Sequence, residues 1–122
     1  MARALIVDDD AFLAGIYASK MEQAGYTVQV ASTAKDAVHK AEATHPDVVM
    51  LDVVLAGASG LDVLSHLRQI AGCEAVPVVM VSNQDDGAIM EEAKRRGAAT
   101  YLIKSYYTPS EIVARVRNAT VG

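Results

Sequence analysis

The stretch PDVVMLDVVLAGASG, residues 46–60, places one carboxylate, Asp52, inside a run of apolar side chains. Four apolar residues precede Asp52 and four follow it. A strand that is buried on both faces of a parallel sheet reads as an unbroken apolar run, and an isolated ionised carboxylate within such a run is costly to desolvate. We therefore expect a strand over residues 48–51 that ends at a polar pocket, with Asp52 on the floor of that pocket.

Similar apolar runs recur along the chain and alternate with segments of helical spacing. The runs predict strands over residues 4–7, 48–51, 77–81 and 99–103, and the alternating β-branched residues of 27–31 predict another strand. Helices are predicted over residues 12–24, 33–45, 61–70, 86–96 and 109–119. Gly25, Gly97 and Thr108 are suitable end or capping residues for three of these helices. Five strands that alternate with five helices predict an α/β fold with a doubly wound parallel sheet and helices on both faces.

Length and composition are typical of one compact domain. The chain has 122 residues, of which 52% are hydrophobic and 21% charged, so we expect a single domain over residues 1–122. The net charge of −4 argues against direct contact with nucleic acid. No apolar stretch reaches the ~18 residues of a membrane span, and no secretory signal is recognisable, so we expect a cytoplasmic location without membrane insertion.

Several reactive or charged side chains receive no role from the sequence. Cys73 is the only cysteine, which excludes an internal disulfide, and it lies in a predicted loop. The basic cluster Lys94–Arg96 is interpreted as a solvated helix end that complements the helix dipole, with a partner's landing site as the alternative. His39, His45 and His66 share no metal-ligand spacing and are expected at the surface.

Polar side chains follow four of the predicted strands at their carboxyl ends. They are Asp8, Asp9 and Asp10, then Asp52, then Ser82 and Asn83, and finally Lys104 and Ser105. In open α/β sheets, sites form at this edge. Two carboxylates ~4 Å apart repel by about 4 kcal/mol at an effective dielectric of 20, so a hard divalent cation such as Mg²⁺ is expected among the acids. The alternative interpretation is helix N-capping by Asp9 or Asp10.

The segments LIVDDD and VVMLDVVLAGASG resemble the acidic pair and the phosphoacceptor segment of the receiver domains of two-component response regulators. The resemblance covers essentially the whole chain. It implies that Asp8, Asp9 and the backbone carbonyl of Val54 bind Mg²⁺ together with Asp52, and that Asp52 is the phosphoacceptor. It also implies a flavodoxin-like three-layer sandwich with strand order 2-1-3-4-5, an order taken from the family and not from the residues.

The same resemblance assigns three further residues. Ser82 in VVMVSN corresponds to the family's switch hydroxyl, Tyr101 in AATYLIK to its switch aromatic residue, and Lys104 to its phosphate-contacting lysine. The implied function is a signalling switch rather than an enzyme. Asp52 would accept a phosphoryl group from a sensor histidine kinase or a histidine phosphotransfer protein. The face formed by the fourth helix, fifth strand and fifth helix would then change its preference for a downstream target protein or a fused output domain.

Two positions depart from the family pattern. Ala56 stands four residues after Asp52, and Ser105 follows Lys104, where the family usually has proline at both places. A cis peptide before Ser105 would cost ~2.5–4 kcal/mol, against about 0.5–1 kcal/mol before a proline. The Lys104–Ser105 peptide is therefore either cis at this cost or trans with a shifted loop.

Two other functions compete with the phosphorylated switch. Asp8 and Asp10, two positions apart after a strand, also fit an aspartate-nucleophile phosphatase of the haloacid dehalogenase type, with Ser82 and Lys104 downstream. That family needs a further acidic pair after the lysine, and Glu111 is the only acid beyond Lys104. The second alternative is a pseudo-receiver, an interaction module with the same fold that is never phosphorylated. Magnesium titration distinguishes a pseudo-receiver from a working switch.

Overall fold

The computed structural model describes residues 2–121, which form one five-stranded sheet, a two-stranded hairpin and five α-helices. The strands of the main sheet are β1 (Arg3–Val7), β2 (Thr27–Ala31), β3 (Val48–Leu51), β6 (Val78–Ser82) and β7 (Thr100–Ile103). The helices are α1 (Ala11–Gln23), α2 (Ala34–Thr44), α3 (Gly60–Leu67), α4 (Gly87–Arg95) and α5 (Pro109–Val121). The hairpin is β4 (Val54–Leu55) with β5 (Ala58–Ser59), and a 3₁₀ turn, η1 (Lys104–Tyr106), follows β7.

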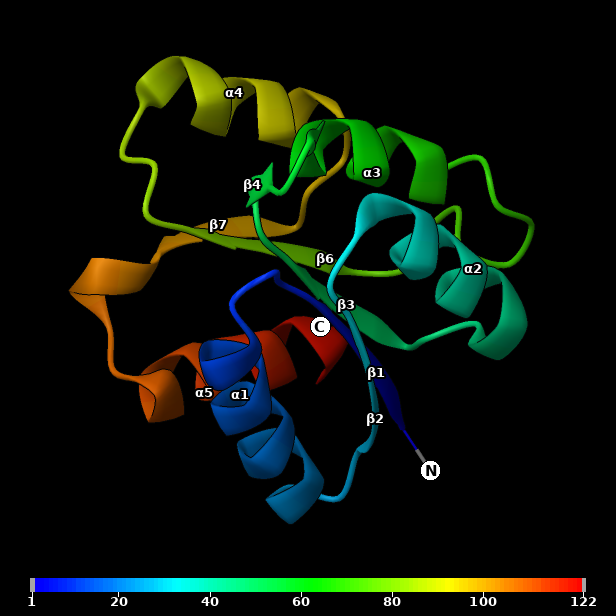
Figure 1. Cartoon of the computed structure of the whole chain (residues 1–122), viewed down its shortest axis with the longest axis vertical. Coiled ribbons are helices and arrows are strands. Elements are labelled where there is room, and N and C mark those ends of the chain that lie inside the picture. The colour runs from blue at the N-terminus through cyan, green and yellow to red at the C-terminus, as the bar shows by residue number, and fades with distance from the viewer. Residues whose placement is uncertain (1, 122) are drawn as a thin grey trace.

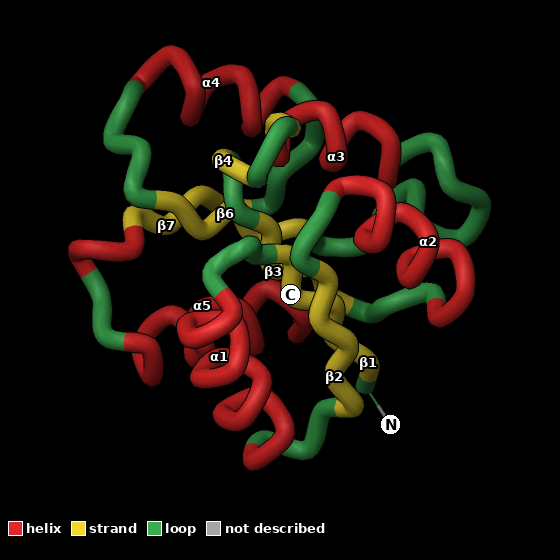
Figure 2. The backbone as a smooth tube through the Cα atoms, in the orientation of Figure 1, coloured by secondary structure: helices red, strands yellow, loops and turns green. Residues whose placement is uncertain are grey.

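The main sheet is parallel throughout and has the order β2-β1-β3-β6-β7. Since β6 and β7 are the fourth and fifth strands of this sheet along the chain, the order is the expected 2-1-3-4-5. Figures 1 and 2 show the strands running through the middle of the molecule with helices on both sides. The prediction of a doubly wound α/β fold is confirmed.

Alternate residues of each strand supply the two halves of the core. Leu5 and Val7 of β1 pack with α2, α3 and α4 on one face of the sheet. Ala4 and Ile6 pack with α1 and α5 on the other face. Because successive side chains of a strand point to opposite faces, a strand between two helical layers needs apolar residues at every position. This explains why β3, at the centre of the sheet, is the apolar run VVML.

Two segments differ from the predicted elements. The residues after Asp52 form the β4–β5 hairpin, in which Val54 pairs with Ser59 and Gly57 occupies a left-handed conformation (φ +70°) at the turn. The predicted helix over residues 61–70 ends earlier, because the amides of Gln69 and Ile70 bond to carbonyls three residues back and tighten the last turn. Every peptide bond of residues 2–121 is trans, including Lys104–Ser105.

The surface agrees with most of the sequence expectations. The three histidines are exposed, whereas Cys73 lies in a loop but has a fully buried side chain. Phe12 shares the helical spacing of the core residues of α1, yet it is 77% exposed in the first turn of that helix. None of the helices in residues 2–121 has both the length and the apolar content that crossing a membrane requires.

Candidate functional site

The carboxyl ends of β1 and β3 bring Asp8 and Asp52 next to each other. Val7 pairs with Leu51 in the parallel register, and the Asp52 amide donates to the Val7 carbonyl at 3.0 Å. One carboxylate oxygen from each of Asp8, Asp9 and Asp52 lies within 4.8 Å of the other two. Asp8 and Asp52 are buried while Asp9 is exposed. The three acids expected to gather at this edge therefore do so.

Lys104 connects the two buried acids. Its ammonium nitrogen Nζ lies 2.8 Å from Asp8 Oδ2 and 2.9 Å from Asp52 Oδ2. The Lys104 and Asp8 side chains are 9% and 5% exposed, so water screens this contact poorly. The other oxygens of the two acids accept backbone amides: Asp8 Oδ1 accepts from Asp10, and Asp52 Oδ1 accepts from Val54.

Burial and charge shift the titration of the pocket. Burial raises the pKa of the Asp52 carboxyl, and the hydrogen bond from Lys104 opposes that shift. Burial lowers the pKa of the Lys104 ammonium, but the hydrogen bonds and negative charges of Asp8 and Asp52 outweigh it, so the net shift is upward. Lys104 is consequently held in its charged form between two carboxylates.

The capping alternative applies to one acid of the cluster. Asp10 is the N-cap of α1, where its side chain accepts from the Leu13 amide at 3.1 Å. Asp8 and Asp9 are not the caps of this helix. Asp10 thus has a structural role at the start of α1, and the two preceding acids lie with Asp52 in the pocket.

The chain returns to the backbone of Asp52 and Val53 at Gly60, the first residue of α3. The Gly60 amide donates to the Val53 carbonyl at 2.6 Å. A Cβ atom at Gly60 would lie 1.9 Å from the Asp52 carbonyl oxygen, so only glycine fits without displacing the backbone that carries the acid. The glycine directly before a predicted helix was the available signal for this close approach.

Ser82 is the last residue of β6, and Tyr101 is the second residue of the neighbouring strand β7. Ser82 is buried, and its Oγ accepts from the Gln84 amide at 3.2 Å. The half-buried Tyr101 donates its hydroxyl to the Gln84 carbonyl at 2.8 Å. Burial raises the pKa of the Tyr101 hydroxyl. Both side chains are thus joined to the same residue of the β6–α4 loop, a link that the sequence did not predict.

The donor set suits a hard divalent cation. Asp8, Asp9 and Asp52 supply carboxylate oxygens, and Asp9, on the solvent side, leaves room for the water ligands that Mg²⁺ keeps. The Val54 side chain is 51% exposed at the rim, and its backbone carbonyl remains a predicted ligand. Asn83 and Ser105 also lie at this edge but are exposed and take no part in the contacts described above.

Fold and site together define a class: a doubly wound α/β protein with an acid cluster and a lysine at the carboxyl edge of its sheet. Residues 4–117 match the family model of the response regulator receiver domain. The chain belongs to this family.

Similar proteins agree with that membership. The DNA-binding response regulator MtrA of Mycobacterium tuberculosis is 36% identical over 115 residues, which cover 94% of this chain and 49% of MtrA. The chain therefore spans about half the length of this relative. Protein PilH of Pseudomonas aeruginosa is 36% identical over 104 residues, covering 85% of this chain and 86% of PilH. The structure of chemotaxis protein CheY4 of Vibrio cholerae superimposes with a TM-score of 0.91 at 24% identity, covering 98% of both chains, and supports the fold.

Proposed function

We propose that this receiver domain is a phosphorylation-dependent switch in which Asp52 accepts a phosphoryl group from a histidine of a sensor kinase or a histidine phosphotransfer protein. The observation that carries the proposal is the Asp52 carboxylate at a strand end, bonded to Lys104 and grouped with Asp8 and Asp9. A structural ion pair needs one acid for one lysine, whereas Lys104 contacts two acids and a third, Asp9, lies with them, so the cluster keeps negative charge that a further cation can neutralise.

The chemistry follows from the charges. A carboxylate oxygen of Asp52 attacks phosphorus, the phosphorus–nitrogen bond of the phosphohistidine breaks, and the imidazole nitrogen keeps the electron pair. The product is an acyl phosphate on Asp52. Mg²⁺, when bound by Asp8, Asp9, Asp52 and the Val54 carbonyl, would neutralise charge on the phosphoryl oxygens. Lys104, already 2.9 Å from Asp52 Oδ2, would transfer its hydrogen bond to one of those oxygens.

The same contacts offer a route for the signal. A phosphoryl oxygen on Asp52 would accept a hydrogen bond from the Ser82 hydroxyl, whose Oγ accepts from the Gln84 amide in the resting protein, and would draw both residues toward Asp52. Movement of Gln84 with Ser82 would break the bond from the Tyr101 hydroxyl and allow that ring to turn inward. The surface formed by α4, β7 and α5 would then present a different shape to a target protein or a fused output domain.

The experiment is chemical-shift mapping by NMR with acetyl phosphate and Mg²⁺. In the parent protein we expect the amides of α4, β7 and α5 to shift as Asp52 becomes phosphorylated. The Ser82→Ala variant should still accept phosphate, yet lose most of those distant shifts. A parent protein that takes up no phosphate under these conditions would instead be a pseudo-receiver. No feature of the site favours the haloacid dehalogenase alternative, and the family match argues against it.

A further inference from the structure

Helix α4 has few buried side chains. Of its residues, only Ala93 is fully buried, and residues 83–88 of the preceding loop and first helical turn are all exposed. A helix with so little buried apolar surface is held mainly by its polar contacts, and the two ends of α4 differ in those contacts. Figure 1 shows α4 beside α3 at one side of the molecule.

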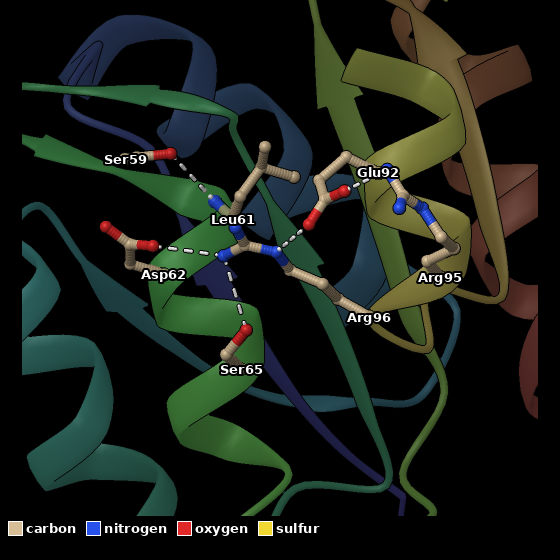
Figure 3. A network of polar contacts seen from close by, with 7 residues as sticks. All are labelled: Ser59, Leu61, Asp62, Ser65, Glu92, Arg95 and Arg96. Atoms are coloured by element: carbon tan, nitrogen blue, oxygen red, sulfur yellow. Dashed lines mark hydrogen bonds and ion pairs between the residues drawn. The ribbon is translucent and has the colours of Figure 1, made fainter. Parts of the chain in front are cut away.

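The C-terminal end of α4 is fastened to α3 by Arg96, the C-cap residue. Its Nη1 donates to Asp62 Oδ1 at 3.0 Å and to Ser65 Oγ at 3.3 Å, both on α3, as Figure 3 shows. Its Nε donates to Glu92 Oε2 at 2.7 Å, which fixes the direction of the guanidinium. One side chain thus connects the last turn of α4 to two successive turns of α3.

A second arginine makes the reciprocal connection. Arg68, the C-cap residue of α3, donates Nη2 to the carbonyl of Gly97, the residue after Arg96, at 2.7 Å. Its Nη1 donates to the carbonyls of Val76 at 2.7 Å and Cys73 at 3.2 Å. Arg96, at the C-terminal end of α4, therefore contacts α3, and Arg68, at the C-terminal end of α3, contacts Gly97 just beyond α4.

The N-terminal end of α4 has weaker connections. Ile89 is half-buried against the core, and the polar contacts at this end are the hydroxyl of Tyr101, which bonds to the Gln84 carbonyl, and the exposed hydroxyl of Tyr106, which bonds to the Asp85 carboxylate. At the C-terminal end, the Arg68 bonds to the Val76 and Cys73 carbonyls are part-buried, and the 30% exposed Arg96 guanidinium is shared among Glu92, Ser65 and the 80% exposed Asp62. The Tyr101 bond is also the one that the proposed switch would break.

We propose that Arg96 and Arg68 form a clamp about which α4 pivots, so that its N-terminal end, which the β6–α4 loop joins to Ser82, moves while its C-terminal end stays on α3. The clamp is a feature of the resting protein. Only the pivoting rests on the proposed function, because the phosphoryl group on Asp52 supplies the displacement of the β6–α4 loop.

The clamp is tested in the resting protein by amide hydrogen exchange of Arg96→Gln and Arg95→Gln. Arg95 is the matched control, because it carries the same charge as Arg96 and lies next to it at the end of α4. Its side chain pairs with Glu92 of its own helix and is 71% exposed. Exchange of the amides of residues 93–97 should be about fivefold faster in Arg96→Gln and nearly unchanged in Arg95→Gln. Asp62→Asn should show part of the Arg96→Gln effect while every arginine is retained. Equal exchange in the Arg96 and Arg95 variants would overturn the clamp.

The pivot is tested by adding fluoroberyllate, a phosphoryl analogue, with Mg²⁺. In the parent protein the change in exchange should be confined to residues 84–90, and in Arg96→Gln it should extend to residues 93–97. A parent response of equal size at both ends of α4 would overturn the pivot. If fluoroberyllate changes no exchange rate in the parent protein, the proposed function and the pivot are both contradicted. The clamp is decided independently, by the exchange rates of Arg96→Gln and Arg95→Gln in the resting protein.

Discussion

Lys104 Nζ lies 2.9 Å from Asp52 Oδ2, although 52 positions separate the two residues in the sequence. Asp52 follows β3 and Lys104 follows β7, so the lysine side chain crosses the end of β6 to reach the acid. The contact therefore joins the ends of two strands that are not neighbours in the sheet, β3 and β7, with β6 between them. Its strength depends on the poor solvation of both side chains, 9% and 11% exposed.

Replacing Lys104 by Gln should destabilise the metal-free protein. The change leaves Asp8 and Asp52 as neighbouring buried carboxylates without their cation, which should lower the free energy of unfolding by about 3 kcal/mol. Mg²⁺ should recover part of this loss, because it binds the folded acids only. Urea unfolding with and without Mg²⁺ measures both effects. Lys94→Gln, an exposed control, should change stability by less than about 0.5 kcal/mol, and an equal loss in the two variants would refute this account.

Replacing Asp9 by Asn should have the opposite effect on the metal-free protein. Removing one of three crowded negative charges should stabilise it by about 1 kcal/mol, or about 4 °C in melting temperature, while weakening Mg²⁺ binding. Thermal melts at low ionic strength and a Mg²⁺ titration provide the two readouts. Glu42→Gln removes one exposed charge outside the cluster and controls for the net charge. A lower melting temperature with unchanged Mg²⁺ affinity would contradict the prediction.

Gly60→Ala should destabilise the protein by at least about 2 kcal/mol, because the new methyl group would overlap the Asp52 carbonyl oxygen at 1.9 Å. The shift of that backbone should also slow phosphorylation. The matched control is Gly15→Ala in α1, where a Cβ meets no atom within 4 Å. It should instead stabilise the protein by about 0.5–1 kcal/mol. Similar unfolding midpoints for the two variants would show that the close approach of Gly60 to the Asp52 carbonyl does not affect stability.

Val54→Asn should shorten the life of the proposed acyl phosphate. The Val54 side chain is 51% exposed at the pocket rim, is apolar and cannot orient an attacking water molecule. Asparagine at this position can hydrogen-bond a water molecule and orient it toward the acyl phosphate, so loss of phosphate should be several-fold faster at equal Mg²⁺. The rate is followed by the decay of the phosphorylated species after the donor is removed. Equal or slower decay in Val54→Asn would show that this side chain does not control water access.

The fold could be predicted from the sequence because its signals are local. The central strands show their burial as apolar runs, as in VVML of β3, and the edge strand β2 shows its half-buried face as an alternating pattern, TVQVA. The pocket was predictable for a related reason, since parallel strands carry the residues after their carboxyl ends, such as Asp8 and Asp52, to one edge.

The remaining features depend on packing between distant segments. The β4 and β5 strands have two residues each, too few for an alternating pattern to appear. The contacts of Arg96 with Asp62 and of Tyr106 with Asp85 join exposed polar residues whose neighbours are set by how α3, α4 and η1 pack. Phe12 has the spacing of a core residue, but its exposure depends on where the first turn of α1 lies relative to the sheet.

The central claim, that Asp52 is the phosphoacceptor, is tested most directly by intact-mass spectrometry after incubation with acetyl phosphate and Mg²⁺. Asp52→Asn keeps the shape of the side chain and removes the nucleophilic carboxylate, and Asp47→Asn, an exposed acid at the opposite end of β3, serves as the control. We expect the parent protein and Asp47→Asn to gain the mass of one phosphoryl group and Asp52→Asn to gain none. The same mass increase in Asp52→Asn would contradict the account.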